Sequence, residues 1–231
     1  MPFKYLLGGS AFLVLVLATA CQRNSEDQKK PQLFAELFVR YLEAERELKA
    51  TATFFEGDSI QTASPKTFSG GVSFQGSGME ARPLPGGVVR YTLQQNADYS
   101  AAFPFRFPSN NGQKQEYTLA MLPIDTFYII DGKASKSQGM SLYAQGGQLQ
   151  AGESLVFLFN DANNRAYSFT LEGPTNGEEY RISAQQLEGL EPGPHQLYLV
   201  RKKRMAEKKP GVSILADVEF YTRLVEVEVE Q

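Results

Sequence analysis

The 231-residue sequence offers few side chains for nucleophilic or metal chemistry, because it contains one histidine, His195, and one cysteine, Cys21. A metal site built from several histidines is therefore excluded. A Ser-His-Asp triad would have to use His195, yet the sequence has no Gly-x-Ser-x-Gly motif, and no serine is followed by lysine three positions later. His195 follows Pro192-Gly193-Pro194, and we expect its ring to hydrogen-bond the chain at this corner.

Carboxylate pairs occur at Glu178-Glu179 and in the C-terminal run VEVEVE, residues 225–230. Two carboxylates can share acid–base work only when their surroundings separate their pKa values. Alternating valine and glutamate instead indicates a strand with one buried and one solvated face. We therefore predict that the protein is not an enzyme and has no cofactor and no metal. A hydrolase on a β-sandwich stays as an alternative, and it would need converging carboxylates or an exposed His195 beside a serine.

Cys21 directly follows the one long apolar run of the sequence. Lys4 precedes this run, residues 6–17 are uncharged and mostly apolar, and the small residues Ala18, Thr19 and Ala20 precede the cysteine. A run of about a dozen residues is short of the roughly 20 that a membrane-spanning helix needs. The arrangement predicts a secretory signal peptide over residues 1–20.

Small residues followed at once by cysteine make this junction similar to the lipobox of bacterial lipoproteins. The resemblance implies cleavage before Cys21, a diacylglyceryl thioether on its sulfur and a further acyl chain such as palmitate on the new amine. Two chains give stable attachment, since each buried methylene contributes about 0.8 kcal/mol. Residue 22 is glutamine, not the aspartate of inner-membrane retention. We therefore expect an outer-membrane location, at the periplasmic face or the cell surface, with residues 21–30 as a polar tether.

The composition favours a β protein and argues against nucleic acid as a partner. Without residues 1–20, which contain one basic residue, the chain has 22 basic and 26 acidic residues and a formal net charge of −4. A nucleic-acid-binding chain usually carries a strong basic balance instead. The sequence has no tryptophan but 16 phenylalanines, 11 tyrosines, 20 glycines and 12 prolines. Such a composition is typical of many short strands joined by turns.

Residues 31–47 differ from the rest, because their apolar side chains recur at spacings of three and four. This periodicity predicts an amphipathic helix with Pro31 in its first turn. Its apolar stripe could pack on its own domain or contact another chain. We take Phe34, Phe38 and Tyr41 on this stripe as candidate partner-binding residues.

From residue 48 onward the pattern becomes that of strands separated by glycine- and proline-rich turns. The segment ESLVFLFND, residues 153–161, is apolar on both faces and predicts a central strand. In residues 212–230, apolar side chains occupy even positions up to Leu224 and odd positions from Val225. A shift of one residue exchanges the faces of a strand, so we predict a bulge near Leu224.

The segment LEGLEPGPHQLYLV, residues 187–200, resembles the crossover before a late strand of immunoglobulin-like domains. The resemblance implies an antiparallel immunoglobulin-like β-sandwich over residues 124–231. A second sandwich is expected over residues 48–123, which gives one N-terminal helix and two tandem sandwiches. One larger sandwich stays open as the alternative.

The densest cluster of charge is basic, and it could bind anionic glycans or lipid headgroups. It could equally be a solvated hairpin tip whose charges protect a strand edge. Taken together, the sequence predicts a lipid-anchored envelope protein that binds or scaffolds a protein or glycan partner, with a glycan-binding surface lipoprotein as the alternative. The residues of this cluster that we take as candidates for partner binding are Arg201, Lys202, Lys203 and Arg204.

Overall fold

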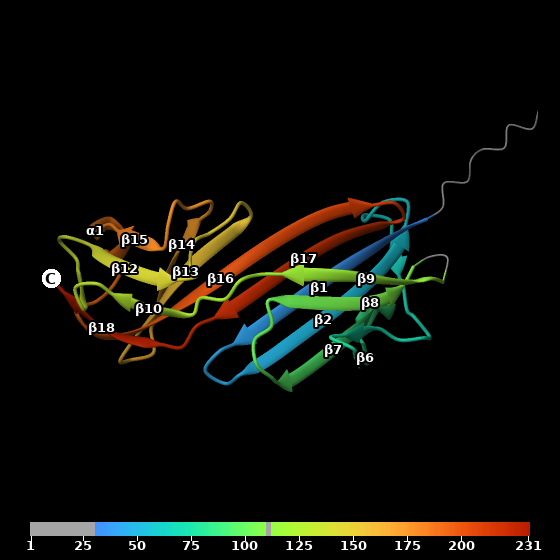
Figure 1. Cartoon of the computed structure of the whole chain (residues 1–231), viewed down its shortest axis with the longest axis horizontal. Helices are drawn as coiled ribbons and strands as arrows, with labels where there is room; N and C mark the ends of the chain where they lie inside the picture. Colours follow the sequence, from blue (N-terminus) through green and yellow to red (C-terminus); the bar gives the residue numbers. More distant parts are fainter. Residues whose placement is uncertain (1–30, 110–111) are drawn as a thin grey trace, which may run out of the picture.

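A computed structural model describes residues 31–109 and 112–231 (Figure 1). This part of the chain folds into an eleven-stranded sheet, a four-stranded sheet and a three-stranded sheet, with a single four-residue α-helix. The expectation of a mostly β protein is confirmed. The predicted signal peptide, Cys21 and the tether lie outside the described residues. Within the described part, no helix is long and apolar enough to cross a membrane.

The long sheet, as we call the eleven-stranded one, runs through the whole molecule. Its strands are β1 (Gln32–Leu42), β2 (Glu47–Gly57), β3 (Ser64–Pro65), β6 (Glu80–Pro83), β7 (Val89–Asn96), β11 (Lys133–Ser135), β13 (Glu153–Asp161), β14 (Ala166–Glu172), β16 (Gly193–Lys209), β17 (Val212–Tyr221) and β18 (Val225–Glu230). Their order is β11-β18-β16-β17-β1-β2-β7-β6, with β13 and β14 paired on the other edge of β16 and β3 beside β2.

The two smaller sheets lie near opposite ends of the molecule (Figure 1). The four-stranded sheet has the order β5-β4-β8-β9, and the three-stranded sheet has the order β10-β12-β15. Between β15 and β16 lies the helix α1 (Ala184–Leu187), and a 3-10 turn, η1 (Pro85–Gly87), precedes β7. The strands of the smaller sheets are β4 (Ser73–Phe74), β5 (Ser77–Gly78), β8 (Ala102–Pro108), β9 (Lys114–Ala120), β10 (Thr126–Ile129), β12 (Met140–Gln145) and β15 (Glu179–Ile182).

Both smaller sheets pack on the long sheet through buried apolar side chains. Phe54 of β2 contacts Phe107 of β8 with 4.9 Å between the ring centroids. At the other end, Phe157 of β13 and Tyr180 of β15 pack edge to face at 6.0 Å. The chain holds this core without a disulfide, because it has one cysteine, so burial of apolar surface is the main driving force.

The helix predicted over residues 31–47 is wrong, because residues 32–42 form strand β1. Burial alternates along it, with Leu33, Ala35, Leu37 and Val39 pointing into the core. The spacing of the large apolar residues fits a helix, but β1 lies between β2 and β17 and is paired along its length with both. These two ladders satisfy the backbone on both edges, so tertiary pairing overrides the local helical pattern.

The 17-residue strand β16 joins the two ends of the molecule. Its first half pairs with β13 and β18, whereas its second half pairs with β17. Strand β17 connects β16 to the N-terminal strands, because it pairs in parallel with β1. This pairing extends from Leu33–Val212 to Leu42–Tyr221. Strand pairing therefore crosses the expected boundary between 48–123 and 124–231, since residues 212–221 pair with β1.

The bulge predicted near Leu224 is confirmed. Between the pairs Val200–Tyr221 and Leu197–Val225, two residues of β16 face the three residues 222–224. The hydroxyl oxygen of Thr222 accepts a hydrogen bond from the backbone N–H of Leu199 at 3.0 Å, which satisfies the interrupted ladder. The extra residue reverses the two faces between β17 and β18.

Candidate functional site

The smaller sheets cover one face of the long sheet and leave the other uncovered. We call this uncovered surface the outer face. Apart from the buried Val200, it consists of the even-numbered residues of β1 and β16 and the odd-numbered residues of β2 and β17, because their alternate neighbours point into the core. The outer face crosses both ends of the molecule without interruption, since β16 extends through both.

Strand register places the two sets of sequence-predicted residues side by side on the outer face. Arg204 pairs with Asp217 across β16 and β17, and Asp217 pairs in turn with Phe38 of β1. Phe38 and the basic cluster are far apart in sequence, yet the parallel pairing of β1 and β17 makes them neighbours. The next row across the sheet is charged and consists of Lys202, Glu219 and Arg40.

The charges on the outer face are largely paired with one another. Lys202 Nζ lies 2.8 Å from Glu219 Oε1, and Arg204 Nε lies 3.7 Å from Asp217 Oδ1. Exposed pairs such as these contribute only about 0–1 kcal/mol each to stability. Their main effect is to arrange positive and negative side chains in fixed positions on the surface. The predicted basic cluster is therefore not a free cationic patch.

Four of the seven predicted partner-binding residues lie on this face, because strand geometry separates neighbours in sequence. Tyr41 points the opposite way and is buried between Tyr99, with 5.1 Å between ring centroids, and Phe220, at 5.8 Å. The idea that Tyr41 shares a face with Phe34 and Phe38 is thus wrong. The predicted residues divide into Phe34, Phe38, Lys202 and Arg204 on the outer face and Tyr41, Arg201 and Lys203 on the inner one.

Arg201 is buried and cannot contact a partner, contrary to the prediction for the basic cluster. Its guanidinium donates to the carbonyl oxygens of Gly146 at 2.7 Å and Gln148 at 2.9 Å and to Glu153 Oε2 at 2.5 Å. Burial alone would raise the pKa of Glu153, but hydrogen bonds from Arg201 and the Gln150 N–H, with the Arg201 and Lys203 charges, lower it. Glu153 is thereby held as a carboxylate within the protein.

Lys203 is also directed inward and is engaged with the protein. Its Nζ donates to the carbonyl oxygen of Ala120 at 2.8 Å and lies 3.6 Å from Glu153 Oε1. Ala120 ends β9, so this contact links the segment between the two smaller sheets to β16. Arg201 and Lys203 therefore hold the segments around Gly146–Gln148 and Ala120 against β16.

The outer face is hollowed in two places that share Leu215 and Asp217. One hollow of about 560 Å³ lies between β13, β14, β16 and β17, and its lining includes Val156 and Ala206. A second of about 290 Å³ lies over β1, β2 and β17, and its lining includes Phe38. Together they form a shallow concavity with apolar side chains on its floor and charged pairs around them.

Leu215 is the residue of this site that the sequence reasoning missed. It is 36% exposed, which is unusual for leucine in the middle of a sheet. The signal was present in the sequence, because the other odd-numbered positions of this segment, Ser213, Asp217 and Glu219, are polar. Leu215 lines both hollows and so joins their apolar floors into one surface.

The sequence analysis singled out the lone histidine and the acidic residues as the side chains with possible chemistry. His195 is buried, its Nδ1 lies 3.0 Å from the carbonyl oxygen of Gly193, and its ring packs edge to face against Phe159. It therefore hydrogen-bonds the corner where β16 begins. Among the residues that the structure describes, no group of three His, Cys, Asp or Glu side chains could hold a metal ion.

No protein-family model matches the chain, and no curated protein matches it either. Among solved structures, a chain from a structure titled "Cytokine receptor complex - Crystal form 1A" is similar over 83% of this chain and 95% of that chain. The two are 11% identical and superpose with a TM-score of 0.33. A likeness at this level carries no conclusion about what the present chain binds or does.

Proposed function

We propose that this protein is a non-catalytic binding or scaffolding module, anchored to the outer membrane by lipid on Cys21, and that its outer face contacts a protein partner. The observation that carries the proposal is the uncovered concavity around Leu215 and Asp217. An apolar floor surrounded by charged side chains is the usual anatomy of a protein–protein interface. The charged pairs around it would orient a partner more than they would add affinity.

We further infer that the scaffold consists of two immunoglobulin-like sandwiches that share the hairpin β16–β17. The order of strands supports this for the C-terminal one, in which β10-β12-β15 packs against β14-β13-β16-β18. In the N-terminal one, β5-β4-β8-β9 would pack against β17-β1-β2-β7-β6. The shared hairpin would keep the two outer faces in one fixed surface.

The position of the chain ends supports display of the β10-β12-β15 end of the molecule away from a membrane. The start of β1, which would follow the lipidated tether 21–30, lies at one end of the long axis, and the C-terminus lies at the other (Figure 1). The N–H of Leu33 donates to the carbonyl oxygen of Gly211 at 3.1 Å, so the β16–β17 turn lies at the same end as Pro31. The β10-β12-β15 end would therefore project outward.

The lipid anchor predicts that Cys21→Ala moves the protein from the membrane fraction to the soluble fraction. The variant has no sulfur to acylate, while Ala18-Thr19-Ala20 still resembles an A-x-A cleavage site, so neither an acyl chain nor the apolar run should hold it in the bilayer. Cell fractionation with immunoblotting measures the distribution, and labelling with a fatty acid followed by mass spectrometry identifies the mature N-terminus. Asn24→Ala, which changes the tether but not the cysteine, should remain lipidated and membrane-bound. Retention of Cys21→Ala in the membrane would contradict the anchor.

The partner surface predicts that Leu215→Glu prevents complex formation in cells without unfolding the protein. A charge at the centre of an interface should cost at least about 2 kcal/mol, or roughly thirtyfold in affinity. A photoreactive amino acid at position 38 should give a discrete crosslinked species that disappears when Leu215→Glu is added. Leu122→Glu is the control, because Leu122 is 63% exposed and lies outside the outer face. Equal crosslinking in both variants would exclude the outer face as the binding surface.

A further inference from the structure

The three-stranded sheet has an uncovered face of its own, and aromatic side chains occupy it. Phe127, Leu142 and Tyr180 point toward the long sheet and are buried. Their neighbours point outward, so Tyr128 of β10 lies beside Tyr143 of β12 in the antiparallel register. The two rings are 5.5 Å apart between centroids and inclined at 40°. This surface, which we call the tyrosine face, is on the opposite side of the molecule from the outer face.

Large apolar groups remain in contact with solvent on the tyrosine face. Tyr128 is 53% exposed, and Ile130, two residues later in the chain, is 47% exposed. The N–H of Ile130 donates to the carbonyl oxygen of Ser141 at 2.9 Å, which keeps this side chain in the same outward row as Tyr128. Contiguous exposed apolar groups that no part of the fold covers mark a binding surface.

Polar side chains with planar groups surround the two rings. Glu179 pairs with Tyr143, and Arg181 pairs with Ser141, so β15 places a carboxylate and a guanidinium on the same face. Glu178 accepts a hydrogen bond from the Tyr143 hydroxyl at 2.8 Å, and this bond raises the pKa of that hydroxyl. The Tyr143 ring is thereby fixed in orientation, since its hydroxyl is held by a neighbouring strand end.

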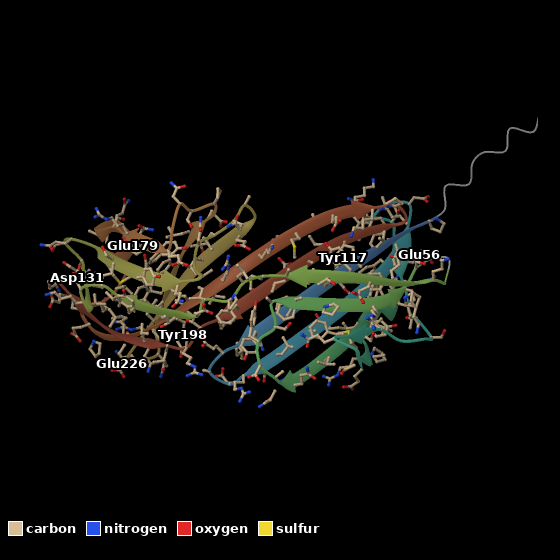
Figure 2. The ribbon with its side chains drawn as sticks, in the orientation of Figure 1. Glu56, Tyr117, Asp131, Glu179, Tyr198 and Glu226 are labelled. Carbon is tan, nitrogen blue, oxygen red and sulfur yellow. The ribbon has the colours of Figure 1, made fainter. Side chains whose placement is uncertain are left out.

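A groove extends from the tyrosine face and continues its polar lining. It has a volume of about 400 Å³, and Ser141 and Arg181 form the side nearest the tyrosines. Asp131 and Lys133 line its far side. Asp131 and Glu179 lie at the end of the molecule remote from the start of β1 (Figure 2). The groove therefore opens at the end that would stand farthest from a membrane.

We propose that the tyrosine face and its groove bind a neutral oligosaccharide. The faces of a sugar ring present C–H groups that pack on tyrosine rings, and its rim presents hydroxyls that both donate and accept hydrogen bonds. Tyrosine suits this role, because it buries a large apolar area and keeps a polar end. Carboxylates and cationic side chains alternate around the rings, so donors and acceptors are both present. Because neither charge dominates, the site favours a neutral sugar over a polyanion.

This proposal depends neither on the lipid anchor nor on the outer face. A protein partner on the outer face and a sugar on the tyrosine face could be bound together, because the two surfaces point in opposite directions. The protein would then connect a carbohydrate to a protein complex.

Affinity electrophoresis of the purified full-length protein in native gels tests the proposal directly. The gels contain either a neutral polysaccharide (glucomannan, galactomannan, xyloglucan or β-glucan) or an acidic one (alginate or polygalacturonate). At least one neutral polysaccharide should retard the protein, and Tyr128→Ala should weaken that binding by at least about tenfold. Tyr198→Ala is the matched control, because Tyr198 of β16 lies between the buried Leu197 and Leu199 and so points to the outer face.

Thermal unfolding establishes that the variants are folded, which is expected because the Tyr128 side chain is exposed. Equal retardation of the wild type and Tyr128→Ala would overturn the proposal. Retardation by acidic polysaccharides alone would overturn it as well, because that would indicate binding by charge. The absence of retardation in every gel would have the same consequence. If binding occurs but Tyr198→Ala and not Tyr128→Ala abolishes it, the sugar binds elsewhere.

Discussion

Replacing Arg201 with alanine should destabilise the folded protein by about 3–5 kcal/mol, because it removes the closest charged partner of the buried Glu153. The side chains of Arg201 and Glu153 are 1% and 2% exposed. Arg201 also satisfies the carbonyl oxygens of Gly146 and Gln148, which would lose their donors. The variant therefore combines two unsatisfied acceptors with a buried carboxylate that keeps only Lys203, at 3.6 Å, and the Gln150 N–H.

Denaturant unfolding measures this effect as a lower midpoint at unchanged slope. Lys202→Ala is the control, because the neighbouring lysine is 46% exposed in its side chain and pairs with Glu219 on the surface. Its loss should cost less than about 1 kcal/mol. The double variant Arg201→Met with Glu153→Gln should be more stable than Arg201→Met alone, since neither charge is then buried. Equal stability of the alanine variants at 201 and 202 would contradict the role of this pair.

The fragment 31–123, which combines the predicted helix 31–47 with the predicted sandwich 48–123, should not fold by itself. It lacks β17, the strand that lies between β16 and β1 in the intact sheet. Complete burial of Ile214, Val218 and Phe220 contributes about 1.5–3 kcal/mol for each side chain. This sum is comparable with the whole stability of a typical domain, about 5–15 kcal/mol.

Circular dichroism and thermal unfolding test this expectation. The isolated fragment should show no cooperative transition, whereas a fusion of 31–123 through a flexible linker to residues 200–221 should regain one. Adding Val218→Asp to the fusion is the control, because a charge at this buried position should abolish the recovery. A cooperative transition in the unfused fragment would show that β17 is dispensable.

Short-range patterns in the sequence predicted the features that depend on a single strand. The alternation of valine and glutamate indicated the strand at residues 225–230, and the change of parity at Leu224 indicated the bulge. In each case the period of two along the strand determines which side chains are buried. Such local reasoning succeeds where the alternation of apolar and polar residues along one strand shows which of its side chains are buried.

Features that depend on distant partners were not predictable in this way. Leu33, Leu37 and Tyr41 are spaced by four, which fits one face of a helix and also one face of a strand. Pairing with β17 determines that this segment is a strand and not a helix. Ser213 of β17 accepts a hydrogen bond from Gln32, which is 181 positions away in the sequence. No local pattern specifies such a pair.

The site was predicted in part, because the strand period was not applied to the basic cluster. Leu197, Leu199 and Arg201 are in phase, so an inward direction for Arg201 follows from the two buried leucines before it. The same period places Lys202 and Arg204 outward. The sequence did not indicate that Arg204 and Phe38 lie near each other. Their proximity depends on the parallel pairing of β1 with β17, which is seen only in the structure.

The position of β1 also has a mechanical consequence for a tethered protein. A pull between the membrane and a bound partner would act on β1 along its length, because this strand begins at the tethered end. Its ladders with β2 and β17 lie across that direction, so they would be loaded in shear and many hydrogen bonds would have to break together. Strand β1 would therefore resist extraction under tension far better than a strand that is unzipped from one end.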